Sequence, residues 1–359
     1  CYSFDESLYE ASVTSFTYNG ADQVDVVVPE TVEHEGKTYT VTSIANGVQG
    51  TYGTQGSFYD PQHKINSVTL PGTLSVIGMN AFQGCSKMQS IDMPGVTTIG
   101  NYAFMQCAGL TSMDLSDRVT SLGSQVFYAC TGLKEVTGMR GLTSLPDYCF
   151  NQCAIESIYI PDNITSFGNG VFSGSQIKNV TGMKGISTLP YYTFSGCTAL
   201  ENFTVPANIT SIGRQAFYCA SALKSVTIPG SVTSIDGYAF YYCEKLESLT
   251  FLTTDTATPT FGGAAFGNCN GVVVHGYTGA STIEKMVQDN SGATVGYTAG
   301  ANFTFQALDA PVATIGSTGY ATLADACAAV RDGQTITLSG DNAESVTIDR
   351  PVSFVLGAG

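Results

Sequence analysis

The fold of this chain is decided by one stretch, Leu223-Lys224-Ser225-Val226-Thr227-Ile228-Pro229-Gly230-Ser231-Val232-Thr233-Ser234-Ile235-Asp236-Gly237-Tyr238-Ala239-Phe240. Its last residue recurs along most of the sequence, at intervals of 22 to 26 residues. The ten copies are Phe58, Phe82, Phe104, Phe127, Phe150, Phe172, Phe194, Phe217, Phe240 and Phe266. A regular internal repeat of this length is typical of a stacked repeat architecture.

Two further positions recur at a nearly fixed spacing from the phenylalanine. From Phe82 onward the third residue after it is small: Cys85, Cys107, Cys130, Cys153, Ser175, Cys197, Ala220, Cys243 and Cys269. The sixth residue after it is usually apolar, as at Leu110, Leu133, Leu200, Leu223 and Leu246. In two coils one residue is missing, and Ile155 and Ile177 take this role at the fifth position. Such a register cannot arise by chance.

The periods within one repeat predict a coil with three inward-facing sides. Val226 and Ile228 alternate with polar residues, as in a half-buried strand, and Pro229 ends that strand because it cannot donate a ladder hydrogen bond. One coil cannot bury its own apolar side chains, whereas stacked coils can, so we predict a solenoid. Truncation of an interior phenylalanine such as Phe217 should then cost about 3–5 kcal/mol.

The repeat resembles the BspA-like class of leucine-rich repeat found in bacterial surface proteins. The residues that carry the resemblance are Ile228-Pro229, Val232 to Ile235, Ala239-Phe240, Cys243 and Leu246, and it covers about residues 40–275. It implies a β-rich, right-handed leucine-rich-repeat solenoid, an α/β horseshoe or arc of about ten coils of 22–24 residues with a parallel sheet on one face. It also implies an exported, surface-exposed protein that acts in adhesion or partner recognition without catalysis. The sequence departs from the more familiar leucine-rich pattern, since Pro229-Gly230 follow the strand and no asparagine ladder appears.

The two ends of the chain differ from the repeats. We expect residues 1–40 to form a capping segment, residues 41–300 the solenoid with its C-terminal cap, and residues 301–359 a small α+β segment. Expected elements near the ends are strands over 24–28, 39–44 and 272–274, a turn over 34–37 and a helix over 281–289. In the last segment we expect a helix over 321–331 and strands over 335–338, 345–348 and 352–356.

The run from Gly319 to Leu338 resembles the opening of parallel β-helix segments in gut bacterial surface proteins. We therefore expect a further β-helix-like domain to begin there and the native chain to continue past Gly359. At the other end, Cys1 is compatible with a removed signal peptide and with a lipid anchor.

The composition excludes several function classes. Charged residues make up 12% of the 359 residues, against ~25% in an ordinary domain, while 43% are apolar, which argues against intrinsic disorder. The formal net charge of −15, with no basic cluster, excludes nucleic acid binding and argues against docking on anionic lipid. No apolar run approaches the ~18 residues of a membrane span.

The cysteines are the first candidates for chemistry. Nine of the eleven lie in the small-residue slot or beside the recurring phenylalanine. Ser175 and Ala220 occupy the same repeat position, so this position requires a small side chain and does not require sulfur. We therefore favour buried thiols over disulfides or metal ligands. Cys149 and Cys153 have the spacing of a ligand pair but no complementary second pair.

No catalytic constellation is recognisable. His34, His63 and His275 are scattered, and no nucleophile elbow, zinc-protease or phosphate-binding motif is present. Asp92 and Asp114 occupy equivalent strand positions in neighbouring coils, so a paired-carboxylate site is weighed against two solvated acids, which we favour. We expect no enzyme activity, cofactor or metal. The Asn-x-Thr sequons, read as by-products of the repeat, are Asn163, Asn179, Asn202, Asn208 and Asn302.

The candidate partner-binding residues lie on the outer faces. The outward strand positions carry mostly small hydroxyl and amide side chains, and tyrosines gather around the phenylalanine turns. Tyrosine is enriched in binding surfaces, and this interpretation is weighed against rings that pack between coils with their hydroxyls at the surface, which we favour. The candidates are Tyr218, Tyr238, Tyr241, Tyr242, Tyr159, Asp92 and Asp114.

We therefore predict a non-enzymatic, extracellular adhesion or recognition protein of the bacterial cell surface, monomeric, that binds a protein or glycan on a host or neighbouring cell. The alternatives are a scaffold for a carbohydrate-active or other domain beyond the chain, and a purely structural spacer.

Overall fold

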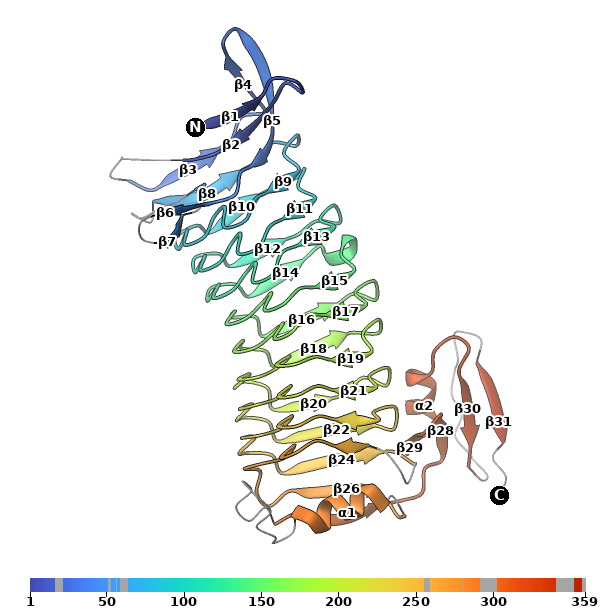
Figure 1. Cartoon of the computed structure of the whole chain (residues 1–359). Coiled ribbons are helices and arrows are strands. Elements are labelled where there is room, and N and C mark those ends of the chain that lie inside the picture. The colour runs from blue at the N-terminus through green and yellow to red at the C-terminus, as the bar shows by residue number, and fades with distance from the viewer. Residues whose placement is uncertain are drawn as a thin grey trace. The chain divides into compact units, whose positions relative to one another are not determined.

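A computed structural model describes residues 1–16, 22–50, 53–55, 57–58, 64–254, 259–279, 281–290, 302–339 and 352–356. The chain forms two compact units, one of Cys1–Gly185 with Tyr192–Cys197 and one of Ile186–Tyr191 with Thr198–Gly359. Both are rich in short strands (Figure 1). Each unit is described in turn.

The first unit opens with two antiparallel hairpins. β1 (Tyr2–Asp5) pairs with β2 (Glu10–Val13), and β4 (Thr31–His34) pairs with β5 (Lys37–Ile44). The turn predicted over 34–37 is confirmed, with Glu35 and Gly36 at positive φ. The strand expected over 24–28 is β3 (Val24–Val27), whereas β1 and β2, which lie outside the repeat pattern, were not predicted. A small hairpin of β6 (Val48–Gly50) and β7 (Gly53–Gln55) follows.

Beyond the hairpins, each coil of the first unit contributes a strand to one or both of two rows of parallel pairs. The first row consists of β3–β8–β10, β12–β14 and β16–β18, with β8 (Ile65–Thr69), β10 (Ser90–Asp92), β12 (Ser112–Asp114), β14 (Glu135–Thr137), β16 (Ser157–Ile160) and β18 (Asn179–Gly182). The second row continues from β5 as β9 (Val76–Ile77), β11 (Thr98–Ile99) and β13 (Ser121–Leu122), then β15 (Ser144–Leu145) with β17 (Ser166–Phe167). Equivalent residues of successive repeats face each other, as Ser90 faces Ser67, which confirms the stacking of coils in register.

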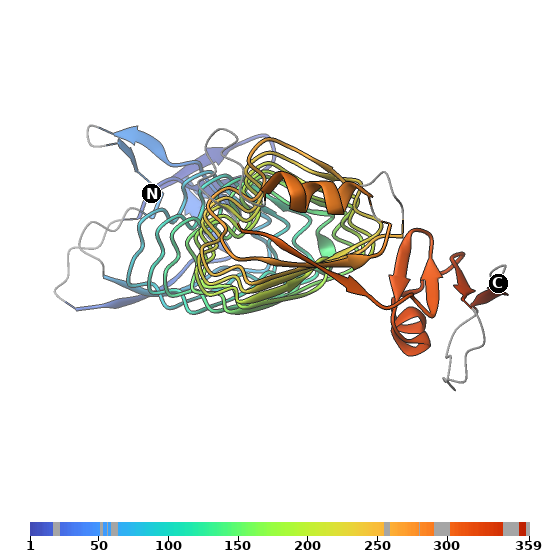
Figure 2. The same cartoon turned by 90° about the horizontal axis from the view of Figure 1, so that it is seen from below.

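The second unit repeats this arrangement with longer ladders. One ladder is β20 (Asn202–Thr204), β22 (Ser225–Pro229), β24 (Ser248–Leu252), β26 (Val273–Tyr277) and β27 (Thr304–Leu308). The other is β19 (Thr188–Leu189), β21 (Ser211–Ile212), β23 (Ser234–Ile235) and β25 (Thr260–Phe261). The predicted helix after the last coil is α1 (Ser281–Asn290), which lies over the end of this stack in Figure 2.

The C-terminal segment of the second unit differs in part from expectation. β28 (Ala313–Ile315) pairs antiparallel with both β29 (Thr318–Tyr320) and β30 (Thr335–Leu338), whereas β31 (Ser353–Leu356) runs parallel to β30. The predicted helix is shorter than expected: α2 (Leu323–Ala329) begins where the Thr322 side chain accepts a hydrogen bond from the Asp325 amide. The strand expected over 272–274 is found as β26, which begins one residue later and extends to Tyr277, and the one expected over 345–348 falls outside the described residues.

The recurring phenylalanines form a buried aromatic column within each unit. From Phe58 to Phe194, successive rings stack with centroids 4.6–5.9 Å apart, and in the second unit Phe217, Phe240 and Phe266 do so at 4.9 and 5.2 Å. All are buried. Phe16, which lies outside the repeat, adds a ring to the column by stacking on Phe58 at 5.4 Å.

A tight turn carries each phenylalanine inward. In nine coils, the residues two before and two after the phenylalanine have left-handed φ. These pairs are Asn80/Gly84, Tyr102/Gln106, Gln125/Ala129, Tyr148/Gln152, Gly170/Gly174, Tyr192/Gly196, Gln215/Cys219, Tyr238/Tyr242 and Ala264/Asn268. Side chains other than glycine rarely adopt this conformation, and here it determines where several tyrosine side chains leave the backbone.

Candidate functional site

Four of the predicted tyrosines form one aromatic cluster on two successive coils of the second unit. Tyr218 stacks on Tyr241 at 5.9 Å, and Tyr242 meets Tyr241 edge-on at 4.6 Å and Tyr218 at 6.3 Å. Tyr238 meets Tyr241 edge-on at 5.3 Å. Offset and edge-to-face pairs of this kind are favourable arrangements of aromatic rings. The structure thus brings these four candidate residues into contact.

Neighbouring side chains hold the cluster in place. The guanidinium of Arg214 lies 5.1 Å from the centroid of the Tyr238 ring, a cation–π contact. A Cβ atom at buried Gly267 would overlap the ring of Tyr241, so glycine at this position of the next coil leaves room for the ring. Tyr242 is 40% exposed. The cluster therefore combines rings packed between coils with a solvent-facing edge, and Gly267 is the residue of the sequence that indicates this packing.

The Tyr218 hydroxyl belongs to a small polar pair at the edge of the cluster. The adjacent Cys219 raises the pKa of Tyr218, and burial adds to this effect. Burial in turn raises the pKa of Cys219. Both groups are therefore protonated at neutral pH and can donate hydrogen bonds to a partner.

The two acids weighed as a paired-carboxylate site lie in successive coils. Asp92 and Asp114 lie on β10 and β12, which belong to different ladders. Asp114 Oδ1 instead accepts hydrogen bonds from the Ser116 amide at 3.0 Å and from Thr137 Oγ1 at 3.2 Å. Both acids are exposed, and the carboxylate of Asp114 joins its own turn to the next coil.

The histidines do not form a site among the described residues. His34 stacks on Phe4 with centroids 4.1 Å apart, in the first unit. His275 lies half-buried in β26 of the second unit, and His63 falls outside the described residues. In the part of the chain that the structure describes, no three His, Cys, Asp or Glu side chains are grouped to hold a metal ion.

The cysteine slot is buried and takes part in hydrogen bonding. The thiols each donate to the carbonyl oxygen of the phenylalanine one coil earlier, at 3.0–3.2 Å; they are Cys85, Cys107, Cys130, Cys153, Cys197, Cys243 and Cys269. Burial raises the pKa of Cys130 and of Cys197 to about 12. The prediction of small buried thiols therefore agrees with the structure, which adds a hydrogen-bonding role to their small volume.

Thiol labelling tests this arrangement. At pH 8, we expect iodoacetamide to modify only exposed Cys1 and half-buried Cys219 and Cys327 in the native protein, because the other eight thiols are buried. Mass spectrometry of the labelled peptides measures this directly. Rapid native labelling of Cys130 would contradict it.

The same thiols predict a loss of stability in alkali. A thiol with a folded-state pKa of about 12 and an ordinary value near 9 stabilises the fold fully below pH 9 and progressively less as the pH rises toward 12. The free energy of unfolding in urea should therefore be lower at pH 10 than at pH 7.5.

Two sequon asparagines also bridge coils. Asn163 Nδ2 donates to the carbonyl oxygens of Met139, at 3.0 Å, and Leu142, at 2.5 Å. Asn208 Nδ2 donates to the carbonyl oxygen of Ile186. These two side chains therefore have a structural role that the sequence pattern did not reveal.

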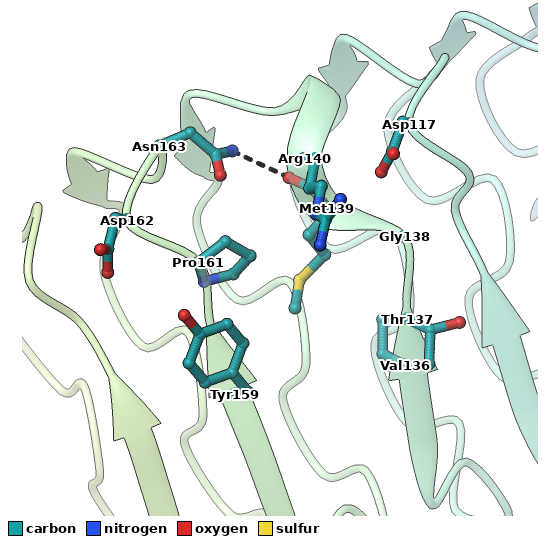
Figure 3. A pocket seen from close by; sticks show the side chains of 10 residues that line it. All are labelled: Asp117, Val136, Thr137, Gly138, Met139, Arg140, Tyr159, Pro161, Asp162 and Asn163. Carbon is teal, nitrogen blue, oxygen red and sulfur yellow. Dashed lines mark hydrogen bonds between the residues drawn. The ribbon is translucent and has the colours of Figure 1, made fainter.

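Tyr159, the remaining tyrosine candidate, lies in the first unit and lines a groove. The groove has a volume of about 640 Å³ and is also lined by Asp117, Val136 to Arg140, and Pro161 to Asn163 (Figure 3). Tyr159 is 59% exposed. Arg140 and the two aspartates were not among the sequence candidates, because their roles depend on how neighbouring coils are aligned.

Comparison with known proteins places these features in a family. The family described as "BspA type Leucine rich repeat region" matches this chain over residues 54–178 and 165–291, with six copies of its repeat. No curated protein matches the chain. Among the described helices, none is long and apolar enough to cross a membrane.

Several solved bacterial structures are similar to this chain. A leucine-rich cell surface protein from Faecalibacterium prausnitzii A2-165 is 20% identical, over 71% of this chain and 94% of that one, with a TM-score of 0.33. The pneumococcal vaccine antigen PcpA is 15% identical, over 83% and 92% of the two chains, with a TM-score of 0.44. A leucine-rich repeat protein from Bacteroides ovatus ATCC 8483 is 20% identical, over 86% and 98%, with a TM-score of 0.32.

The family match spans more than half of the chain, and it coincides with the stacked coils and their phenylalanine column. The chain belongs to the BspA-type leucine-rich repeat family.

Proposed function

We propose that this chain is a non-enzymatic recognition protein of a bacterial cell surface, which binds a protein on a host or neighbouring cell. The observation that carries the proposal is the cluster of Tyr218, Tyr238, Tyr241 and Tyr242 beside Arg214. Tyrosine and arginine dominate the energetically important positions of protein interfaces. Repeat solenoids commonly bind partners through such outer surfaces.

The cluster favours a partner that presents apolar and basic side chains. The rings offer apolar faces that are already packed, so little side-chain entropy is lost on binding. The net charge of −15 repels acidic partners at long range and attracts basic ones. An exported location and a right-handed arc of about ten coils are parts of the same proposal, and both follow from the resemblance noted in the sequence.

A scaffold role is the second candidate, because the C-terminal segment is fastened to the coils of the second unit. Ser317 Oγ donates to the Gly230 carbonyl oxygen at 2.5 Å, and the Thr254 amide donates to the Ser317 carbonyl oxygen at 2.9 Å. Thr253 and Thr318 form an antiparallel bridge. Such fixed attachment suits a solenoid that presents another module.

Substitution of the cluster tests the recognition role. On an array of host-cell surface proteins, we expect the full chain to bind a partner, and Tyr218→Ala or Tyr242→Ala to lower its affinity at least tenfold, or about 1.4 kcal/mol. Titration by biolayer interferometry measures the change.

Tyr128→Ala is the matched control, since Tyr128 follows its phenylalanine just as Tyr218 does, and it should change the affinity less than twofold. Equal affinity of the wild type and both cluster variants would exclude this surface. An array without any bound protein would favour the scaffold instead.

A further inference from the structure

The groove beside Tyr159 lies where two successive coils have different turns after their strands. β16 ends at Ile160 and is followed by Pro161, whereas β14 ends at Thr137 and is followed by Gly138-Met139-Arg140-Gly141. Gly138 has a φ of 73°, and Met139–Gly141 form a short 3-10 helix. The described strands β14 and β16 are not joined in a ladder, so the groove lies between the ends of two separate sheets.

Charges of alternating sign follow one position of the turn through four successive coils. In order along the stack they are Asp117, Arg140, Asp162 and Lys184. Lys184 Nζ lies 3.6 Å from Asp162 Oδ2, which makes an ion pair. Arg140 has no ion-pair partner within 4.0 Å among the described residues, and its side chain is exposed over the groove (Figure 3).

The contrast between Arg140 and Lys184 is informative because their turns are nearly identical in sequence. Residues 138–141 read Gly-Met-Arg-Gly and residues 182–185 read Gly-Met-Lys-Gly. One cation is neutralised within the protein, and the other is left with its guanidinium donors free for a ligand.

The walls of the groove offer an apolar platform and separate acceptors. The Tyr159 ring is 59% exposed and lies beside Pro161, and Val136 and Met139 line the groove as well. Asn163 Nδ2 is committed to the Met139 and Leu142 carbonyl oxygens, which leaves Oδ1 as an acceptor. The Asp117 and Asp162 carboxylates are also acceptors only.

We propose that this groove binds a neutral pyranose residue of a saccharide. A sugar hydroxyl both donates and accepts, so neighbouring hydroxyls can meet the Arg140 donors and the Asp117, Asp162 and Asn163 acceptors at the same time. The apolar C–H face of a pyranose ring fits the exposed Tyr159 ring. The volume of about 640 Å³ lies within the range of about 300–1,000 Å³ typical of small-ligand sites.

Charged ligands fit the groove less well. An anionic sugar or an acidic peptide would pair with Arg140 but meet repulsion from Asp117 and from the net charge of −15. A basic peptide would be repelled by Arg140. A neutral ligand with many hydroxyl groups avoids both costs.

The test uses the full chain and four neutral probes: maltotriose, cellotriose, lactose and N-acetyllactosamine. Saturation-transfer NMR should detect binding of at least one, and titration calorimetry should then give its affinity. We expect Tyr159→Ala to weaken binding at least tenfold and Arg140→Ala three- to tenfold, while Tyr159→Phe keeps most of the affinity. The control Lys178→Ala should change it less than twofold, because Lys178 is ion-paired with Glu156 and neither residue lines the groove.

Salt dependence and a second control separate this site from the alternatives. The affinity for the neutral probe should change less than twofold between 50 and 300 mM NaCl, because no net charge is neutralised. Tyr242→Ala should leave sugar binding unchanged, so this inference succeeds or fails separately from the proposed protein partner.

Three results would overturn the proposal: no binding of any of the four probes, equal affinity of Tyr159→Ala and wild type, or tighter binding of glucuronic acid than of the neutral sugars. A protein partner whose binding requires Tyr159 and is not displaced by the sugars would instead assign the groove to protein recognition. Circular dichroism should show unchanged folding of all variants, since every substituted side chain is exposed.

Discussion

Replacement of Phe127 by alanine is expected to lower the free energy of unfolding by about 3–5 kcal/mol. Phe127 is fully buried, and its ring stacks on Phe104 at 5.6 Å and on Phe150 at 5.7 Å. Truncation would remove its burial from water and leave a cavity in the middle of the aromatic column, which close-packed neighbours could fill only in part. Urea unfolding followed by circular dichroism measures the difference.

Tyr159→Ala is the control for this prediction, because it removes an aromatic ring of similar size from an exposed position of the same unit. It should change stability by no more than about 0.5 kcal/mol. If Phe127→Ala cost less than 1 kcal/mol, the column could not be the continuous core that the repeat implies.

Gly182→Ala is expected to cost about 3 kcal/mol, the second-largest effect. Gly182 has a φ of 83°, a conformation that disfavours any side chain, and a Cβ atom there would overlap the carbonyl oxygen of Ile160 in the preceding coil. Two penalties therefore add at one position, backbone strain and a steric clash between coils. The midpoint of thermal or urea unfolding would show the loss.

Gly84→Ala separates these two penalties. Gly84 has a similar φ of 77°, but a Cβ atom there would meet no atom within 4 Å. Only the backbone strain of about 1 kcal/mol should appear. Equal losses in the two variants would mean that the coils separate readily at Gly182 and that their spacing is less rigid than the structure indicates.

Most of the coil could be predicted because the same pattern of apolar, small and polar residues recurs in each repeat. The phenylalanine, the small residue three positions later and the alternating strand all reappear in the structure as column, thiol slot and parallel pairs. The strand pairings that the sequence did not predict lie in segments outside the repeats. The hairpin of β1 and β2 and the antiparallel pairing of β28 depend on contacts that occur only once, so no periodic pattern in the sequence predicts them.

The candidate sites show the same division. The tyrosines around Phe217 and Phe240 could be named from their spacing, but not the left-handed backbone at Tyr238 and Tyr242 that directs their side chains. Nor could the sequence distinguish paired Lys184 from unpaired Arg140, which occupy equivalent positions in nearly identical turns.

Sequence alone determined that this chain must stack its repeats, because no single coil of its composition can bury its own apolar side chains. It also determined which side of each coil faces inward, through the alternation of apolar and polar residues. Only the tertiary structure decided what the outer faces can bind. A binding surface is made by side chains of different coils at distances set by coil-to-coil packing, and one repeat carries no information about its neighbour's ion pairs, glycines or sheet ends.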